Sequence, residues 1–132
     1  MAIDYGVKRT GIAVSDPLRI IATGLTTVNS GELMAFLKKY CSDEQVDKIL
    51  VGIPINLDGS DTHGTAPARS ALKKIREQFP SIAVEEIDER FSSKMAKQAM
   101  IEMDLSRKKR RDKKLVDEIA ATILLQEYMQ GN

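Results

Sequence analysis

The strongest constraint on the fold is a nearly continuous apolar run from Ile49 to Ile53, inside the segment VDKILVGIP at residues 46–54. Such a run predicts a strand that is buried on both faces, which is typical of a parallel sheet covered by helices. The chain has 132 residues, so we expect a single domain over residues 1–132 with enough length to bury one hydrophobic core.

Residue patterns on either side of this strand predict the remaining elements. Runs rich in β-branched residues predict strands at residues 2–5, 10–15, 20–28 and 81–90. Helical spacing of apolar residues predicts helices at residues 33–40, 68–79, 95–103 and 113–129. Asn29 and Glu32 resemble a capping box, Ser92 is placed to cap the third helix, and Val116 and Ile123 are expected in the core. The order β-β-β-α-β-α-β-α-α predicts an α/β fold, with a mixed five-stranded sheet flanked by helices.

Acidic side chains stand at positions that would meet at one edge of this sheet. Asp4 lies at the end of the first strand, and Asp88 and Glu89 lie at the end of the last strand. Asp117 lies one turn before two alanines on the core-facing stripe of the final helix. Ligand sites in such sheets gather at the carboxyl ends of the strands. Carboxylates that converge there would repel one another unless a cation neutralised them, and oxygen ligands suit Mg²⁺ or Mn²⁺.

Each of these acids also has a simpler interpretation. Asp4 taken alone would be a turn residue, and Asp88 or Glu89 would be a solvated end of a strand. Asp117 would be an exposed acid near the start of a helix, where the helix dipole favours negative charge. The only histidine, His63, is expected in an exposed loop rather than in a catalytic site.

Positive charge is concentrated in the segment RKKRRDKK at residues 107–114, whereas the whole chain has a net charge of only +1. Phosphate contacts from such a segment give affinity for nucleic acid without reading its sequence. Because the segment precedes the helix with Asp117, it suits a polyanionic substrate. The alternative is a solvated loop that contacts no partner.

Two further observations concern location. No apolar run approaches the ~20 residues that a helix needs to span a bilayer, so we expect no membrane partner. Cys41 is the only cysteine and cannot form an internal disulfide, which fits a reducing compartment. We therefore expect a soluble cytoplasmic protein.

Four ordered motifs resemble those of the YqgF/RuvX family, namely AIDYGVKRTGIAVSD, VGIPINLDGS, IDERFSS and VDEIAA. Members of that family have an RNase H-like fold and are described as Holliday-junction resolvases and as nucleases that mature the 5′ end of pre-16S rRNA. The resemblance implies that Asp4, Glu89 and Asp117 are catalytic and hold two divalent ions, Mg²⁺ or Mn²⁺. Asp88 competes with Glu89 for this role. Adjacent strand residues point to opposite faces, and the family pattern favours Glu89.

The resemblance also implies a surface that binds nucleic acid. Its expected members are Lys8, Arg9, Asn56, Asp58, Arg69, Arg90, Arg107, Lys108, Lys109, Arg110 and Arg111. Lys8 and Arg9 would hold a phosphate at the first hairpin, and Gly52 and Pro54 would shape the loop after the central strand. The preferred substrate is structured RNA, specifically pre-16S rRNA, and the alternative is branched DNA. A symmetric resolvase needs a dimer, and the sequence leaves the oligomeric state open.

Two other functions fit parts of the sequence. Sugar kinases and actin-like ATPases also begin with Asp-x-Gly and a hairpin, but they bind nucleotide between two such domains, and this chain has room for one. A non-catalytic nucleic-acid-binding module would keep the fold and dispense with the acids, whereas all three acids are present. Metal-dependent cleavage would distinguish a nuclease from both.

Overall fold

The computed structural model describes residues 1–89 and 112–131, and the structural statements below concern these residues. The strands are β1 (Ala2–Tyr5), β2 (Arg9–Ser15), β3 (Ala22–Asn29), β4 (Lys48–Ile53) and β5 (Ala83–Asp88). The α-helices are α1 (Leu33–Asp43), α2 (Thr65–Gln78) and α5 (Lys113–Gln130). The predicted mixed five-stranded sheet is confirmed, with strand order β3-β2-β1-β4-β5.

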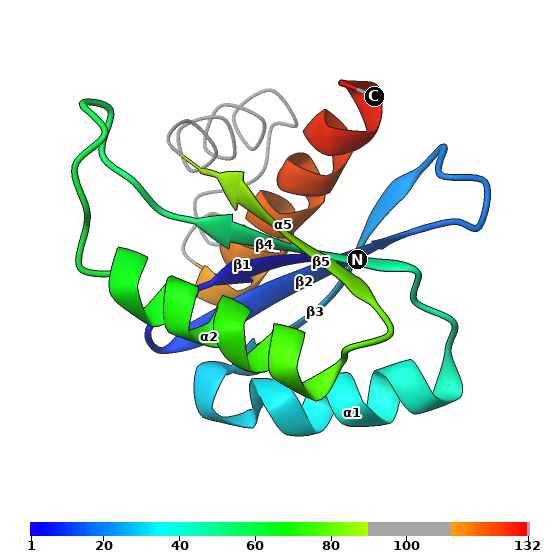
Figure 1. Ribbon diagram of the computed structural model, residues 1–132. Coiled ribbons are helices and arrows are strands. Elements are labelled where there is room, and N and C mark those ends of the chain that lie inside the picture. The colour runs from blue at the N-terminus through cyan, green and yellow to red at the C-terminus, as the bar shows by residue number, and fades with distance from the viewer. Residues whose placement is uncertain (90–111, 132) are drawn as a thin grey trace.

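The sheet has an antiparallel half and a parallel half. β1 pairs antiparallel with β2, and β2 pairs antiparallel with β3. β4 pairs parallel with both β1 and β5. In Figure 1 the arrowheads of β1, β4 and β5 point to the same side of the molecule, where the β1–β2 hairpin and the start of α5 also lie. The carboxyl ends of the parallel strands therefore share one edge with both of these segments.

Alternation along the strands gives the sheet two apolar faces. One face contributes Ile3, Ile12 and Val51 to a core with α1 and α2, and the opposite face packs its smaller side chains against α5. Figure 1 shows α1 and α2 on one side of the sheet and α5 on the other. Strand β4 is buried on both faces, as its apolar run predicts, because Ile49, Leu50 and Val51 are each at most 2% exposed.

The third strand begins later than its composition predicts. Ile20 and Ile21 are not strand residues, and their side chains are 68% and 62% exposed. Their backbone N–H groups both donate to Oδ1 of Asp16 at 2.7 Å. A tight turn closed by one carboxylate thus takes two β-branched residues out of the strand.

Three smaller predictions about helices also need revision. The capping box is wrong, because the Asn29 side chain makes no capping hydrogen bond and residues 30–32 form a short 3₁₀ turn. Val116 and Ile123 are only half-buried, and Ala121 and Leu125 occupy the core instead. Ser92 and the helix expected at residues 95–103 lie outside the described residues. Within residues 1–89 and 112–131, no helix is both long and apolar enough to cross a membrane.

Candidate active site

The site is built around Asp4, which lies near the carboxyl end of the central strand β1. Its partners across the sheet are both glycines, Gly11 on β2 and Gly52 on β4. Because residues directly opposite one another across strands share a face of the sheet, the two positions flanking Asp4 carry no side chain. This gap on the face toward α5 leaves space for groups from elsewhere in the chain.

Glu89 occupies the space above Gly52. A Cβ atom at Gly52 would lie 2.5 Å from Cδ of Glu89, so only glycine leaves room for this side chain. Glu89 follows β5 directly, its backbone N–H donates to the carbonyl of Ile53 at 3.1 Å, and its side chain is 8% exposed. The preceding residue, Asp88, pairs with Ile53 in the sheet and is exposed. The structure therefore brings Glu89, and not Asp88, beside Asp4.

Burial favours the protonated form of the Glu89 carboxyl group. Removal from water is the main cause that raises the pKa of Glu89, to about 11, followed by a side-chain hydrogen bond with Asp4 and by the charges of Asp4 and Asp88. Glu89 is therefore protonated at neutral pH and donates a hydrogen bond to Asp4. Two carboxyl groups in a buried site avoid mutual repulsion by holding a proton between them.

Asp117 approaches from α5 above the second glycine. A Cβ atom at Gly11 would lie 2.0 Å from the backbone oxygen of Asp117, so α5 packs directly against the backbone of β2. Nε of Arg9 donates to Oδ2 of Asp117 at 3.0 Å. Burial raises the pKa of Asp117, the hydrogen bond and charge of Arg9 oppose this effect, and the charge of Asp4 adds to it. Asp4 thus interacts electrostatically with both Glu89 and Asp117.

The three acids gather around one strand end without forming a preassembled set of ligands. Among residues 1–89 and 112–131, no three acidic, histidine or cysteine side chains lie close enough to hold one metal ion. Glu89 is hydrogen-bonded to Asp4, and Asp117 is held by Arg9. The donor set nevertheless fits Mg²⁺ or Mn²⁺ in its chemistry, since it consists of carboxyl oxygens, the ligands that these cations prefer.

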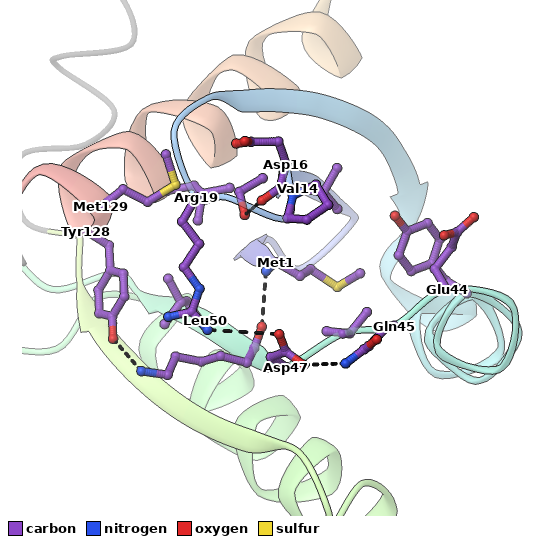
Figure 2. A pocket seen from close by; sticks show the side chains of 16 residues that line it. Met1, Val14, Asp16, Arg19, Glu44, Gln45, Asp47, Leu50, Tyr128 and Met129 are labelled. Carbon is purple, nitrogen blue, oxygen red and sulfur yellow. Dashed lines mark hydrogen bonds and ion pairs between the residues drawn. The ribbon is translucent and has the colours of Figure 1, made fainter.

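A cavity of about 490 Å³ adjoins the Asp4–Glu89 pair. It is bounded by Tyr5 at the end of β1, by Gly6 after it, and by the loop that joins β4 to α2, including Leu57. Figure 2 shows a different cavity, of about 410 Å³, at the opposite edge of the sheet. Lys48 and Tyr128 line that second cavity and are joined by a hydrogen bond of 2.7 Å, and none of the three acids lies in its wall.

The residues predicted to bind nucleic acid fall into three groups. Lys8 and Arg69 are exposed, on the β1–β2 turn and on α2. Asn56 and Asp58 are also exposed, but both hydrogen-bond to Ser60 and so stabilise their own loop. Arg90 and the basic residues Arg107, Lys108, Lys109, Arg110 and Arg111 lie outside the described residues.

One sequence-based role changes in the structure, and a second residue gains a partner that the sequence did not predict. Arg9, predicted to hold a phosphate, forms an ion pair with Asp117. Gly52 was expected to shape a loop, but it lies inside β4 and accommodates Glu89. Sequence reasoning missed the role of Gly11 altogether. The signal was available in the sequence, because pairing the residues on either side of the β1–β2 turn places Gly11 opposite Asp4.

The order of the five strands, with helices on both faces, is that of the RNase H-like fold. A solved structure with this architecture is a Fowlpox virus resolvase in complex with Holliday junction DNA. It matches with a TM-score of 0.57 over 98% of this chain and 95% of the other, at 14% sequence identity. This similarity establishes the fold.

The chain belongs to the family described as RuvX, Holliday junction resolvase, whose model matches residues 1–131. Similar proteins carry the name "Putative pre-16S rRNA nuclease". Those from Christiangramia forsetii and Flavobacterium psychrophilum are 50% and 49% identical over 129 residues, which cover 98% of this chain and 96% and 94% of theirs. One from Porphyromonas gingivalis is 45% identical over 131 residues, 99% of this chain and 95% of its own. Family and relatives support a nuclease, a hydrolase that acts on nucleic acid.

Proposed function

We propose that the chain is a divalent-metal-dependent nuclease that processes the 5′ end of pre-16S rRNA. The observation that carries the metal dependence is the contact of Asp4 with the buried Glu89, near Asp117 at the carboxyl edge of the sheet. The names of the relatives support the RNA substrate. An rRNA substrate also implies action in the cytoplasm.

In this proposal Asp4, Glu89 and Asp117 would hold two Mg²⁺ or Mn²⁺ ions. Bound there, such ions would supply an activated water and stabilise the leaving oxygen at phosphorus. Glu89 must lose its proton to become a ligand, so metal binding releases a proton from the site. Gly11 and Gly52 keep the face of Asp4 open, so both carboxyl groups can approach it from α5 and from the end of β5.

The exposed charges around the cavity would hold the substrate. Lys8 lies at the β1–β2 turn, next to the residues that bound the cavity beside Asp4 and Glu89. Contacts from such side chains to phosphates would fix the backbone of the nucleic acid without selecting a base sequence. The basic segment at residues 107–114 would extend this surface toward flanking phosphates, since it runs directly into α5.

The direct test is to incubate the purified protein and Mn²⁺ with an rRNA precursor and with a four-way DNA junction in parallel. We expect cleavage of the precursor at its 5′ side, and no cleavage by Asp4→Asn or in the presence of a chelator. The alternative function, resolution of Holliday junctions, is favoured by the family description. Paired symmetric cuts in the junction with an intact precursor would favour that alternative. Binding of both substrates without cleavage would favour a non-catalytic module.

A further inference from the structure

We propose that Arg9 is a positioning residue that exchanges partners. It holds the carboxylate of Asp117 while no divalent cation is bound, and it turns to a phosphate of the nucleic acid when Asp117 serves as a metal ligand. The inference deepens the proposed nuclease function and rests on it. Three features of the described residues support it, namely the geometry of the pair, its charges and its place beside the cavity.

The Arg9–Asp117 contact is suited to exchange. Arg9 is the first residue of β2, so its backbone is fixed by the sheet while its long side chain lies at the edge. The side chains of Arg9 and Asp117 are 28% and 25% exposed, so neither is locked in the core. The contact uses Nε, which leaves the terminal nitrogens of the guanidinium outside this hydrogen bond.

Charge makes Arg9 a competitor of a divalent cation. Asp117 is partly buried and experiences the negative charge of Asp4, so it requires a nearby positive charge. Arg9 supplies that charge by direct contact, whereas Lys113 acts on Asp117 through its charge. A cation bound by Asp117 would supply the same charge at the same carboxylate. Two partners that share one carboxylate weaken each other's binding by the same factor.

The location gives the released side chain a second partner. Arg9 follows the β1–β2 turn directly. A Cβ atom at Gly6, which lines the cavity beside Asp4 and Glu89, would lie 2.4 Å from the carbonyl oxygen of Arg9. A substrate phosphate placed at these acids would lie near this turn, and a guanidinium binds phosphate through two parallel N–H groups more readily than an ammonium does. Metal binding and nucleic-acid binding are therefore expected to strengthen each other through Arg9.

The first test measures Mn²⁺ affinity by isothermal titration calorimetry, without nucleic acid. Arg9→Gln is expected to bind Mn²⁺ roughly three-fold more tightly than the wild type or better, because the competing ion pair is removed. The matched control is Lys113→Gln, which also removes one positive charge acting on Asp117 but leaves the Arg9 contact intact, and its gain should be smaller. Unchanged or weaker Mn²⁺ binding by Arg9→Gln would overturn the exchange and identify Arg9 as a fixed brace. Arg9→Lys keeps the charge without the planar group and should give an intermediate affinity.

The second test measures the affinity for a fluorescein-labelled RNA hairpin by anisotropy, with EDTA or with Mn²⁺, and checks on a gel that the RNA stays intact. The wild type should bind the RNA more tightly with Mn²⁺ than with EDTA. Arg9→Gln should bind the RNA as tightly as the wild type in EDTA, but Mn²⁺ should increase its affinity much less. Lys8→Gln, the control, should weaken binding by the same factor in both conditions. An equal loss with and without Mn²⁺ for Arg9→Gln would contradict the exchange.

The two tests separate this inference from the proposed function. The wild type could bind Mn²⁺ and cleave RNA while Arg9→Gln shows neither tighter Mn²⁺ binding nor a smaller effect of Mn²⁺ on RNA affinity. In that case only the exchange of partners by Arg9 fails. If the wild type binds no Mn²⁺ in the calorimeter, both fail. Thermal unfolding of each variant in EDTA verifies that the substitution preserves the fold.

Discussion

At the scale of single residues, the main feature is a protonated acid in a site that favours a cation. Glu89 is 8% exposed and forms a hydrogen bond with Asp4. This hydrogen bond between two carboxyl groups requires that Glu89 carries its proton, and burial favours that protonated form. The same side chain would have to be ionised as a metal ligand. Protons and metal ions therefore compete at Glu89, and this competition can be measured without a substrate.

Glu89→Gln should flatten the pH dependence of stability in EDTA. The pKa of Glu89 is about 11 in the folded protein against an ordinary value of 4.5, so the folded state keeps a proton that the unfolded chain releases. Stability contributed by Glu89 is therefore full below about pH 4.5 and decreases as pH rises, by up to about 1.4 kcal/mol per pH unit. Urea unfolding from pH 5 to 9 measures this slope. Parallel curves for the variant and the wild type would contradict it, and the exposed Asp88→Asn should leave the slope almost unchanged.

Cleavage assays should rank the acids according to their positions. Asp117→Asn and Glu89→Gln should be inactive with Mn²⁺, because each loses a charged ligand without a change in size. Asp88→Asn should be impaired at most, since Asp88 is exposed and pairs with Ile53 rather than facing Asp4. Cleavage at the wild-type rate by Asp117→Asn would contradict the three-acid site, and a dead Asp88→Asn with an active Glu89→Gln would reverse the assignment.

At the scale of elements, two glycines control how closely other segments approach Asp4. Gly11 admits the backbone of α5, and Gly52 admits the side chain of Glu89. The start of α5 is fixed separately, because Asp112 caps the helix through the backbone N–H groups of Lys114 and Leu115. The position of Asp117 therefore depends on a cap and a close helix–strand contact, in addition to the sequence of α5.

Gly52→Ala should reduce cleavage at least ten-fold and preserve the fold. The new Cβ would lie 2.5 Å from Cδ of Glu89, so this side chain must leave its place beside Asp4, at a cost of about 1–3 kcal/mol in stability. Single-turnover rates and thermal unfolding report the two effects. Gly31→Ala is the matched control, because a Cβ there meets nothing within 4 Å. Full activity of Gly52→Ala would show that the position of Glu89 is not required.

At the scale of the whole molecule, the distribution of charge determines where a polyanion can bind. Acidic groups gather at Asp4, and the basic segment at residues 107–114, with seven basic and one acidic residue, leads into the helix that carries Asp117. A nearby field of one sign matters more to a partner than the net charge of +1. The basic segment would attract phosphates that the carboxyl groups repel.

Replacing Arg107, Lys108, Arg110 and Arg111 with Gln should weaken RNA binding whatever the RNA sequence. Each lost phosphate contact should lower the slope of log affinity against log salt by roughly 0.7–0.9. The single-turnover rate at saturating RNA should change little, because the acids remain. An unchanged salt slope would indicate a solvated segment, whereas a large loss of rate with intact binding would indicate a role in the chemistry.

The sequence by itself determined the order of the elements within residues 1–89 and 112–131, the burial of β4 on both faces and the family. These follow from local periodicity and composition, as in the run from Ile49 to Ile53, or from ordered motifs. It also placed Asp4 and Glu89 near the ends of β1 and β5. Because adjacent strand residues point to opposite faces, only one of Asp88 and Glu89 was expected to face Asp4.

Only the tertiary structure decided which groups meet. Arg9 and Asp117 are 108 residues apart in the chain and touch because α5 packs against β2 at Gly11. Strands β1 and β4 pair so that Gly52 lies opposite Asp4. Glu89 lies beside Asp4 because it occupies the space that a side chain at Gly52 would fill. Local patterns carry no information about such cross-strand gaps, since the gaps arise from the packing of segments distant in sequence. The ion pair of Arg9 and the proton of Glu89 depend on that packing for the same reason.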